Sequence, residues 1–285
     1  MLRIALPNTG RLADQARTLF TDAGLPLPTS GDRTLRTTVA GEFEALFVRA
    51  ADIPEFVADG AADAGITGWD LVLESGRGLR SRLDLQFGQC SLVVAVREDS
   101  SVGSLGDIAS GSRVATSFPR LAAGFFATAG VPVDIVPVGG AAEVAPHLGI
   151  AEVVVDLSTS GSTLRANGLR AIATVVESSA RFVTAEAAPA ALERSLRDLA
   201  DVLDSVVLAR ANRYVMANIP RSALPAIRDI LPGLRGPTVV DVMNAGHHVA
   251  VHAVVPAASV FRTIANLRSL GGEGILVTRI ERLLP

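Results

Sequence analysis

Short aliphatic runs alternate with glycine-containing turns and amphipathic stretches along most of this chain, and this alternation constrains its fold more than any other feature. The segment "ADAGITGWDLVLES" (62–75) predicts a strand, a turn and a helix, and "SRVATSFPRLAAGFFATAG" (112–130) repeats that order. Such a repeat is typical of a doubly wound α/β sheet whose strands are buried on both faces. Because aromatic residues make up only 4% of the chain, aliphatic side chains have to fill its cores.

The last part of the 285-residue chain follows another pattern. From about residue 213 the sequence predicts a strand, helix, strand, strand, helix and strand, with "NAGH" (244–247) as a hairpin turn. This is the ferredoxin-like order, which by itself indicates no function. Between the two patterns we expect a helix over 141–150, one strand over 175–185 and a long helix over 188–213.

Charge and hydropathy argue against several classes of protein. The net charge is -3 and no basic tail is present, so we expect no binding to nucleic acid. No apolar run approaches the roughly 18 to 20 residues of a membrane helix, and the apolar segment at the N-terminus is too short for a signal peptide. We therefore expect a cytoplasmic protein that does not bind membranes. All 26 cationic residues are arginine, so arginines or backbone groups must make any contacts with phosphate.

The segment "DLSTSGSTLRANGL" (156–169) places six small residues, Ser158 to Thr163, directly after an aliphatic run. Successive amides in such a turn form an anion-binding nest, and the start of a following helix adds a positive dipole end. Asp156 at the strand end can accept hydrogen bonds from ribose hydroxyls or orient a hydrated metal ion. The glycine–lysine pair of a Walker motif is absent. The alternative is an ordinary polar turn in which Ser162 or Thr163 caps the helix.

The same segment resembles the phosphoribosyl pyrophosphate signature of the ATP phosphoribosyltransferase family, the first enzyme of histidine biosynthesis. That signature combines an acidic strand end, a Thr/Ser-Gly-x-Thr-Leu turn and an Asn-Gly-Leu sequence. Further similar blocks follow in the family's order over essentially the whole chain: "LRIALPNTGRL", "RAADIPEFVADGAADAGITG", "RVATSFP", "GAAEVAPHLGIAEVVVDLSTSGSTL" and "RYVMANIPRSAL".

The resemblance implies an architecture. It predicts an α/β catalytic unit of two lobes, similar to periplasmic binding proteins, followed by a ferredoxin-like (βαββαβ, ACT-like) regulatory domain. Lobe one is expected to comprise residues 1–90 and 181–211, and lobe two residues 91–180 with the phosphoribosyl pyrophosphate loop. Residues 212–285 are expected to form the regulatory domain of the family's long form, which needs no separate regulatory subunit.

The resemblance also implies a reaction, the transfer of ribose 5-phosphate from phosphoribosyl pyrophosphate to N1 of ATP with release of pyrophosphate. The leaving group should be neutralised by Mg2+ and by arginines. Because N1 of adenine is already nucleophilic, positioning should matter more than a strong base. The implied partners are ATP, phosphoribosyl pyrophosphate, histidine as an inhibitor and AMP, in a homo-oligomer between a dimer and a hexamer.

Most of the implied site residues lie in lobe two. The 5-phosphate loop comprises Ser158, Thr159, Ser160, Gly161, Ser162 and Thr163. Asp156 and Glu152 are expected to act in catalysis, near the ribose hydroxyls or near magnesium through water. The family usually has aspartate where Glu152 stands. Glu143 is expected to contact substrate.

In lobe one, Gly10 and Arg11 occupy the first turn, where the family places phosphate contacts. Arg49 is a catalytic candidate that would contact the pyrophosphate or the triphosphate, and Asp70 is expected to contact substrate. In the regulatory domain, histidine is expected to bind near Leu234, Thr238 and Gly272.

Two departures from the family leave alternatives open. The family usually has a lysine near Asn8 or Thr9, and often a basic residue in the helix after "RVATSFP", where this chain offers only Arg120. Arg11 and Arg120 are the candidates to replace that charge. The alternatives are a diverged phosphoribosyltransferase with another acceptor base, and a non-catalytic paralogue that binds histidine or nucleotide. A solute-binding protein also has two α/β lobes, but neither a phosphate loop nor a ferredoxin-like tail is expected there.

Overall fold

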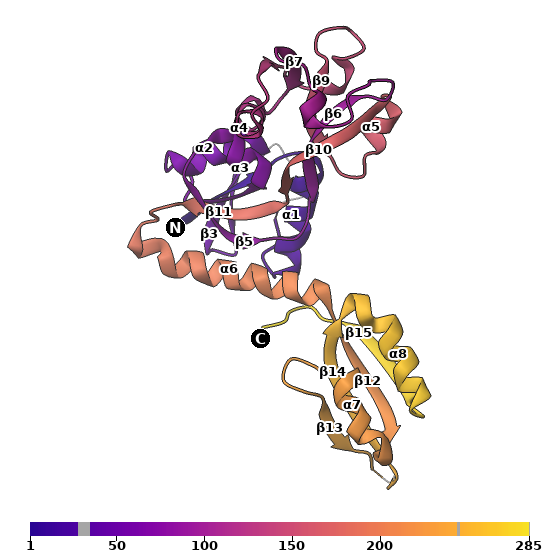
Figure 1. Ribbon diagram of the computed structural model, residues 1–285. Helices are drawn as coiled ribbons and strands as arrows, with labels where there is room; N and C mark the ends of the chain where they lie inside the picture. The colour runs from indigo at the N-terminus through magenta and orange to yellow at the C-terminus, as the bar shows by residue number, and fades with distance from the viewer. Residues whose placement is uncertain (28–34, 244–245, 285) are drawn as a thin grey trace. The chain divides into compact units, whose positions relative to one another are not determined.

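The computed structural model describes residues 1–27, 35–243 and 246–284 (Figure 1). The chain divides into two compact units. One comprises Met1–Thr18 and Pro26–Ala200, and the other Leu19–Leu25 and Asp201–Pro285. None of the helices in the described ranges is both long and apolar enough to cross a membrane.

The first unit contains two sheets, and the first of them forms lobe one. Its six strands lie in the order β2-β3-β1-β4-β11-β5. These strands are β1 Leu2–Pro7, β2 Arg36–Val39, β3 Phe43–Val48, β4 Ala64–Gly68, β5 Leu79–Asp84 and β11 Ala180–Ala185. The helices of this lobe are α1 Gly10–Asp22, α2 Ile53–Ala58 and α3 Trp69–Ser75. Strands β3, β1 and β4 are parallel, so their carboxyl ends share one edge of the sheet.

The second sheet forms lobe two, with five strands in the order β10-β6-β9-β7-β8. These are β6 Cys90–Arg97, β7 Ser112–Thr116, β8 Val133–Pro137, β9 Val153–Ser158 and β10 Leu169–Ser178. The helices are α4 Pro119–Ala129 and the short α5 Ser162–Ala166. Strands β7, β8 and β9 are parallel and again end at a common edge. Aliphatic strand residues such as Val94 and Val155 pack with Phe126 of α4 in the core, as the composition predicts.

The chain passes between the two sheets twice, from β5 to β6 and from β10 to β11 (Figure 1). The two passages are hydrogen-bonded to each other, because Ala180 N–H donates to Phe87 O and Leu85 N–H donates to Ala180 O. The predicted two-lobed α/β unit is therefore confirmed. The single strand predicted over 175–185 is wrong: it is two strands of different sheets that meet at Ser179, and the apolar pattern does not show this change of partner.

Helix α3 of lobe one is joined to lobe two at its C-terminal end. Arg120 N–H and Leu121 N–H of α4 donate to the two carboxylate oxygens of Glu74, both at 2.9 Å. Glu74 therefore caps the first turn of α4 from the other lobe. The guanidinium of Arg120 lies against Gly76, where an added Cβ would come within 2.4 Å of it.

The helix predicted over 141–150 is wrong. The segment forms one 3₁₀ turn, η3 Ala142–Val144, followed by further turns. Pro146 has no N–H with which to continue a helical hydrogen-bond ladder, and Gly149 has a positive φ of 67°. The segment is thereby a loop that connects β8 to β9.

The second unit contains the ferredoxin-like part of the chain. After α6 Ala190–Ala211, its elements are β12 Asn212–Pro220, α7 Leu224–Ile230, β13 Thr238–Asp241, β14 His248–Pro256, α8 Val260–Ser269 and β15 Glu273–Arg279. The antiparallel order β13-β14-β12-β15 confirms the predicted ferredoxin-like fold. Two residues of the predicted hairpin turn, 244 and 245, lie outside the described residues.

Candidate functional site

With one exception, the residues predicted for the catalytic site lie at the carboxyl edges of the two sheets. In lobe one, Gly10 and Arg11 follow β1, Arg49 follows β3 and Asp70 follows β4. In open α/β sheets, ligands bind in the crevice outside these strand ends. The strand directions therefore collect these residues, which are far apart in the sequence, at one edge.

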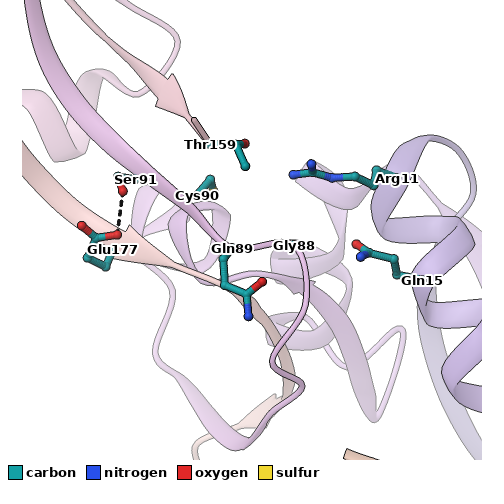
Figure 2. A pocket seen from close by; sticks show the side chains of 8 residues that line it. All are labelled: Arg11, Gln15, Gly88, Gln89, Cys90, Ser91, Thr159 and Glu177. Atoms are coloured by element: carbon teal, nitrogen blue, oxygen red, sulfur yellow. Dashed lines mark hydrogen bonds between the residues drawn. The ribbon is translucent and has the colours of Figure 1, made fainter. Parts of the chain in front are cut away.

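A cavity of about 350 Å³ connects this edge with lobe two (Figure 2). It is lined by Arg11 and Gln15 of α1, by residues 88–91 where the chain enters β6, by Thr159 and by Glu177 of β10. Its volume is in the range of small-molecule sites. The cavity brings together two predicted site residues, Arg11 and Thr159, with others that the sequence did not single out.

The turn between β1 and α1 positions the first residues of α1 at the cavity. Asn8 N–H donates to Val48 O at 2.8 Å, which ties the turn to the end of β3. Gly10 has a φ of 80°, a conformation in which glycine avoids the strain of a side chain. Arg11 follows at once, and Figure 2 shows its guanidinium pointing across the cavity toward Thr159. Arg11 thus supplies a positive charge to the wall of the cavity.

The loop from Ser158 to Thr163 is held by its own polar groups. Gly161 N–H donates to Ser158 Oγ at 3.0 Å, and the hydroxyls of Ser160 and Ser162 lie 2.9 Å apart. Gly161 has a φ of 71°. Arg165 of α5 donates to Ser160 O at 3.1 Å, so a cation lies beside the loop. Because α5 has only five residues, its dipole contributes little at this loop. An anion bound here would be held mainly by loop amides and hydroxyls.

Asp156 lies at the carboxyl end of β9, directly before this loop, and is half-buried. Burial raises the pKa of its carboxyl group, and the nearby carboxylate of Glu143 raises that pKa further. A hydrogen bond from Leu157 N–H, at 2.7 Å, acts in the opposite direction. The structure therefore brings Glu143 and Asp156 together at the edge of lobe two.

Glu152 is the exception, because it lies at the opposite end of β9. It accepts hydrogen bonds from Arg113 N–H at 2.7 Å and from the Arg113 guanidinium at 2.5 Å. This contact lowers the pKa of Glu152. Glu152 and Asp156 are therefore not brought together as the predicted pair of catalytic or magnesium-binding groups.

Asp70 is only 4% exposed and does not line the cavity. Ser178 Oγ donates to its carboxylate at 2.5 Å, and Asp70 N–H donates to Ser178 Oγ at 2.9 Å. The side chain therefore joins α3 to the second passage between the lobes. Its position favours a role in holding the lobes over direct contact with substrate.

The two remaining arginine candidates also lie outside the cavity. Arg49 is an exposed side chain that pairs with Asp52 at 2.8 Å. It occupies the same sheet edge as Arg11 and can reach a ligand only by leaving that pair. Arg120 packs against Gly76 and does not line the cavity.

The three predicted effector residues are not brought together within one chain. Thr238 of β13 pairs with His252, which pairs with Met216, which in turn pairs with Leu276 of β15. The edge strands β13 and β15 are therefore three interstrand steps of about 4.8 Å each apart. Gly272 directly precedes β15, and Leu234 is an exposed residue before β13.

Several cavity residues were missed by sequence reasoning. Gln15 follows Arg11 by one helical turn, a spacing that could have indicated it. Cys90 lines the cavity and is half-buried, and burial together with the charge of Asp70 raises the pKa of its thiol. Glu177 accepts a hydrogen bond from Ser91 Oγ at 2.6 Å (Figure 2). No local motif marks Glu177, because it reaches the site only through the pairing of β10 with β6.

Comparisons with known proteins agree on one family. Residues 49–205 match the family model HisG, ATP phosphoribosyltransferase, and residues 209–282 match the model of the HisG C-terminal domain. The ATP phosphoribosyltransferase of Gemmatimonas aurantiaca is 61% identical, and that of Methanococcoides burtonii 44%, each over the full length of both chains. A solved ATP phosphoribosyl transferase (HisG:HisZ) complex from Thermotoga maritima shares the fold, with a TM-score of 0.63 at 23% identity over 73% of this chain and 99% of that one. By sequence over its whole length, the chain belongs to the ATP phosphoribosyltransferase family, in the long form with its own C-terminal domain.

Proposed function

We propose that this chain transfers ribose 5-phosphate from phosphoribosyl pyrophosphate to N1 of ATP, with release of pyrophosphate, at the cavity between α1 and the loop after β9. Family membership makes it an enzyme of pentosyl transfer, the first step of histidine biosynthesis. The observation that carries the location is the cavity itself, which places Arg11 opposite the loop residue Thr159.

The loop from Ser158 to Thr163 would hold the 5-phosphate through its amides and hydroxyls. Arg165 beside the loop would add charge, and so would Arg11 on the opposite wall of the cavity. Hydrogen bonds to charged groups contribute about 1.5–3 kcal/mol each, so these two arginines can offset the lysine missing near Asn8. Asp156, directly before the loop, would accept hydrogen bonds from ribose hydroxyls.

Positioning would supply most of the rate acceleration. N1 of adenine is nucleophilic without deprotonation, so the protein needs to hold it in line with the bond from C1′ of the ribose to pyrophosphate. Positive charge beside the departing pyrophosphate would stabilise the transition state. Arg11 is the lining residue that carries such a charge.

Magnesium fits this site as a companion of the substrate and does not fit as an ion held by the predicted protein pair. Glu152 and Asp156 lie at opposite ends of β9, and the described residues contain no group of three or more ligands suited to a metal. Mg2+ commonly binds through substrate phosphates and water with few protein carboxylates. We therefore infer that magnesium enters on the pyrophosphate, and no step requires a metal held by the protein.

Inhibition by histidine and self-association belong to the same proposal. The open face of the C-terminal sheet exposes apolar side chains, among them Met216, Val240 and Leu276. Such a face favours contact with a second copy of the chain. A histidine site that used Thr238 and Gly272 together would take them from two copies, because one chain holds them at opposite sheet edges.

The test is the appearance of N1-substituted adenine nucleotide, followed by its ultraviolet absorbance. The assay contains ATP, phosphoribosyl pyrophosphate, magnesium and a pyrophosphatase, with and without histidine. Wild-type protein should form product, and histidine should suppress it. Arg11→Gln should lower kcat/KM by about 10-fold or more, whereas Arg97→Gln, which breaks an exposed pair with Asp99, should change it less than about twofold.

If no product forms from ATP, further assays would distinguish the alternative functions. Product formed with another base but not with ATP would indicate a diverged acceptor site. Binding of phosphoribosyl pyrophosphate without any transfer would indicate a non-catalytic paralogue. Equal activities of the two arginine variants would contradict the location of the site.

A further inference from the structure

The N-terminus of helix α4, in lobe two, is capped by a residue of lobe one. Phe118 precedes the helix and has no side-chain acceptor, and the first turn contains no acidic residue. A side-chain oxygen at that point normally accepts hydrogen bonds from the amides of the second and third helical residues. Here those amides, of Arg120 and Leu121, donate to the two carboxylate oxygens of Glu74, each at 2.9 Å. A carboxylate of α3 therefore takes the place of the missing cap.

The charges of this contact are reciprocal. Arg120 extends from the start of α4 to the end of α3, where its guanidinium lies against Gly76. The positive end of α4 thus meets a carboxylate, and the negative end of α3 meets a cation. Both arrangements are stabilising. We call these two contacts, Glu74 with the amides of α4 and Arg120 with Gly76, the interlobe latch.

The latch lies farther from the passages between the lobes than the contact of Asp70. Asp70 and Glu74 are four residues apart on α3, so they lie on one face of the helix, and both bind lobe two. Asp70 binds Ser178, the last residue of β10, directly beside the second passage. A rotation of the lobes about the passages would move Ser178 least and α4 more. Such a rotation would therefore break the contact of Glu74 first.

The candidate cavity depends on the angle between the lobes, because its walls belong to both. Arg11 and Gln15 come from lobe one, whereas Thr159 and Glu177 come from lobe two (Figure 2). A ligand that contacts Arg11 and Thr159 together binds only while these walls face each other. The apparent affinity of such a ligand falls in proportion to the fraction of free protein that has this arrangement.

We propose that Glu74 is a positioning residue that latches the two lobes at the angle at which Arg11 and Thr159 line one cavity. Neither Glu74 nor Arg120 lines that cavity, so the latch acts without touching the substrate. It keeps the binding-competent arrangement of the free protein populated. The expected effect on phosphoribosyl pyrophosphate rests on the proposed function, whereas the effect on the cavity of the free protein does not.

Cys90 allows the state of the cavity to be measured. It is the only cysteine of the chain and lies half-buried at the cavity wall (Figure 2). Glu74→Gln keeps the size of the side chain but leaves one acceptor oxygen for two amides. In the free variant, Cys90 should react with iodoacetamide about threefold faster than in wild type, or more, because the walls separate more often. Iodoacetamide is uncharged, so Arg11 does not attract it.

Steady-state kinetics give a second readout. In Glu74→Gln the KM for phosphoribosyl pyrophosphate should rise about tenfold, because less of the free enzyme can bind it. The kcat should stay within about twofold, because bound substrate restores the arrangement. Glu55→Gln is the matched control, since Glu55 pairs with Arg77 of its own lobe, and it should change neither readout. Arg120→Gln removes the other half of the latch and should shift both readouts in the same direction by a smaller factor.

An unchanged labelling rate of Cys90 or an unchanged KM in folded Glu74→Gln would each overturn the latch. A lower Tm with both readouts unchanged would mean that Glu74 only caps α4. A lower kcat at unchanged KM would place Glu74 in the chemical step and would overturn it as well. If Glu74→Gln does not fold, Arg120→Gln decides by the same readouts. A wild-type protein that transfers nothing to ATP would contradict the proposed function, and the labelling rates would still decide on the latch.

Discussion

The two ends of strand β9 carry acidic residues in contrasting environments. Glu152, before the strand, is exposed and paired with Arg113, which lowers its pKa. Asp156, near the carboxyl end, is half-buried beside Glu143, and its pKa is raised. Four residues of strand separate them by about 13 Å, although their side chains point to the same face. Glu152 forms an ion pair at the surface, whereas Asp156 adjoins the loop that follows β9.

The difference shows how a parallel sheet assigns roles to similar residues. In open α/β sheets, ligands bind outside the carboxyl ends of parallel strands, which here are the ends of β7, β8 and β9. An acidic residue at that end is partly desolvated and available to substrate, while one at the other end finds a surface arginine. Four predictions follow from this contrast.

The largest effect should come from Asp156→Asn. The substitution keeps the shape of the side chain but removes the charge that would accept the ribose hydroxyls, so kcat/KM for phosphoribosyl pyrophosphate should fall by about 100-fold. Steady-state kinetics at fixed ATP measure it. A loss below about threefold in a folded variant would remove Asp156 from the site.

A smaller effect concerns the pH dependence of the reaction. Burial and then the charge of Glu143 raise the pKa of Asp156, so activity on the acid side should be lost at a higher pH than for an ordinary aspartate. Glu143→Gln removes the second cause, and the acid limb of the kcat/KM profile should move to lower pH. The position of the limb is the readout, whatever happens to the maximal rate. An unmoved limb would mean that another group controls it.

The same carboxyl group should influence stability with a definite sign. Since its pKa is higher in the folded than in the unfolded protein, the stability it provides is complete below the unfolded pKa and is lost as the pH rises through the folded pKa. At pH 7 Asp156→Asn should therefore unfold at a higher urea concentration than wild type, and the difference should vanish in acid. A variant less stable than wild type at pH 7 would contradict the raised pKa.

The smallest effect should come from Glu152→Gln. The pair with Arg113 is exposed and screened by water, so the free energy of unfolding should fall only slightly. Because Arg113 lowers the pKa of Glu152, this contribution is present above the unfolded pKa and disappears as the pH falls through the folded one. Activity should stay within about twofold of wild type. A loss similar to that of Asp156→Asn would show that both ends of β9 act in catalysis.

Local patterns account for much of the fold and part of the site. The aliphatic run before Asp156 and the small residues after it indicated a strand that ends in a phosphate loop, and β9 ends at Ser158. The ferredoxin-like order was visible because each of its elements is amphipathic over its own length. In contrast, the strand predicted over 175–185 failed because an apolar run does not show which sheet each half joins.

Contacts between distant segments could not be predicted in this way. Glu74 caps α4 from 46 residues away, and Glu152 meets Arg113 across 39 residues. Glu177 carries no motif, and it reaches the cavity only because β10 pairs with β6. Each of these features depends on how the sheets are assembled.

The sequence by itself determined where strands end in glycine and hydroxyl residues, because backbone geometry and polarity act over a few neighbouring positions. It also carried the blocks that place the chain in its family. Only the tertiary structure decided that Glu152 pairs with Arg113 and that Arg11 lines the same cavity as Thr159 of the loop after β9. The physical reason is that strand direction and sheet order, and not distance along the chain, set which side chains share a desolvated site.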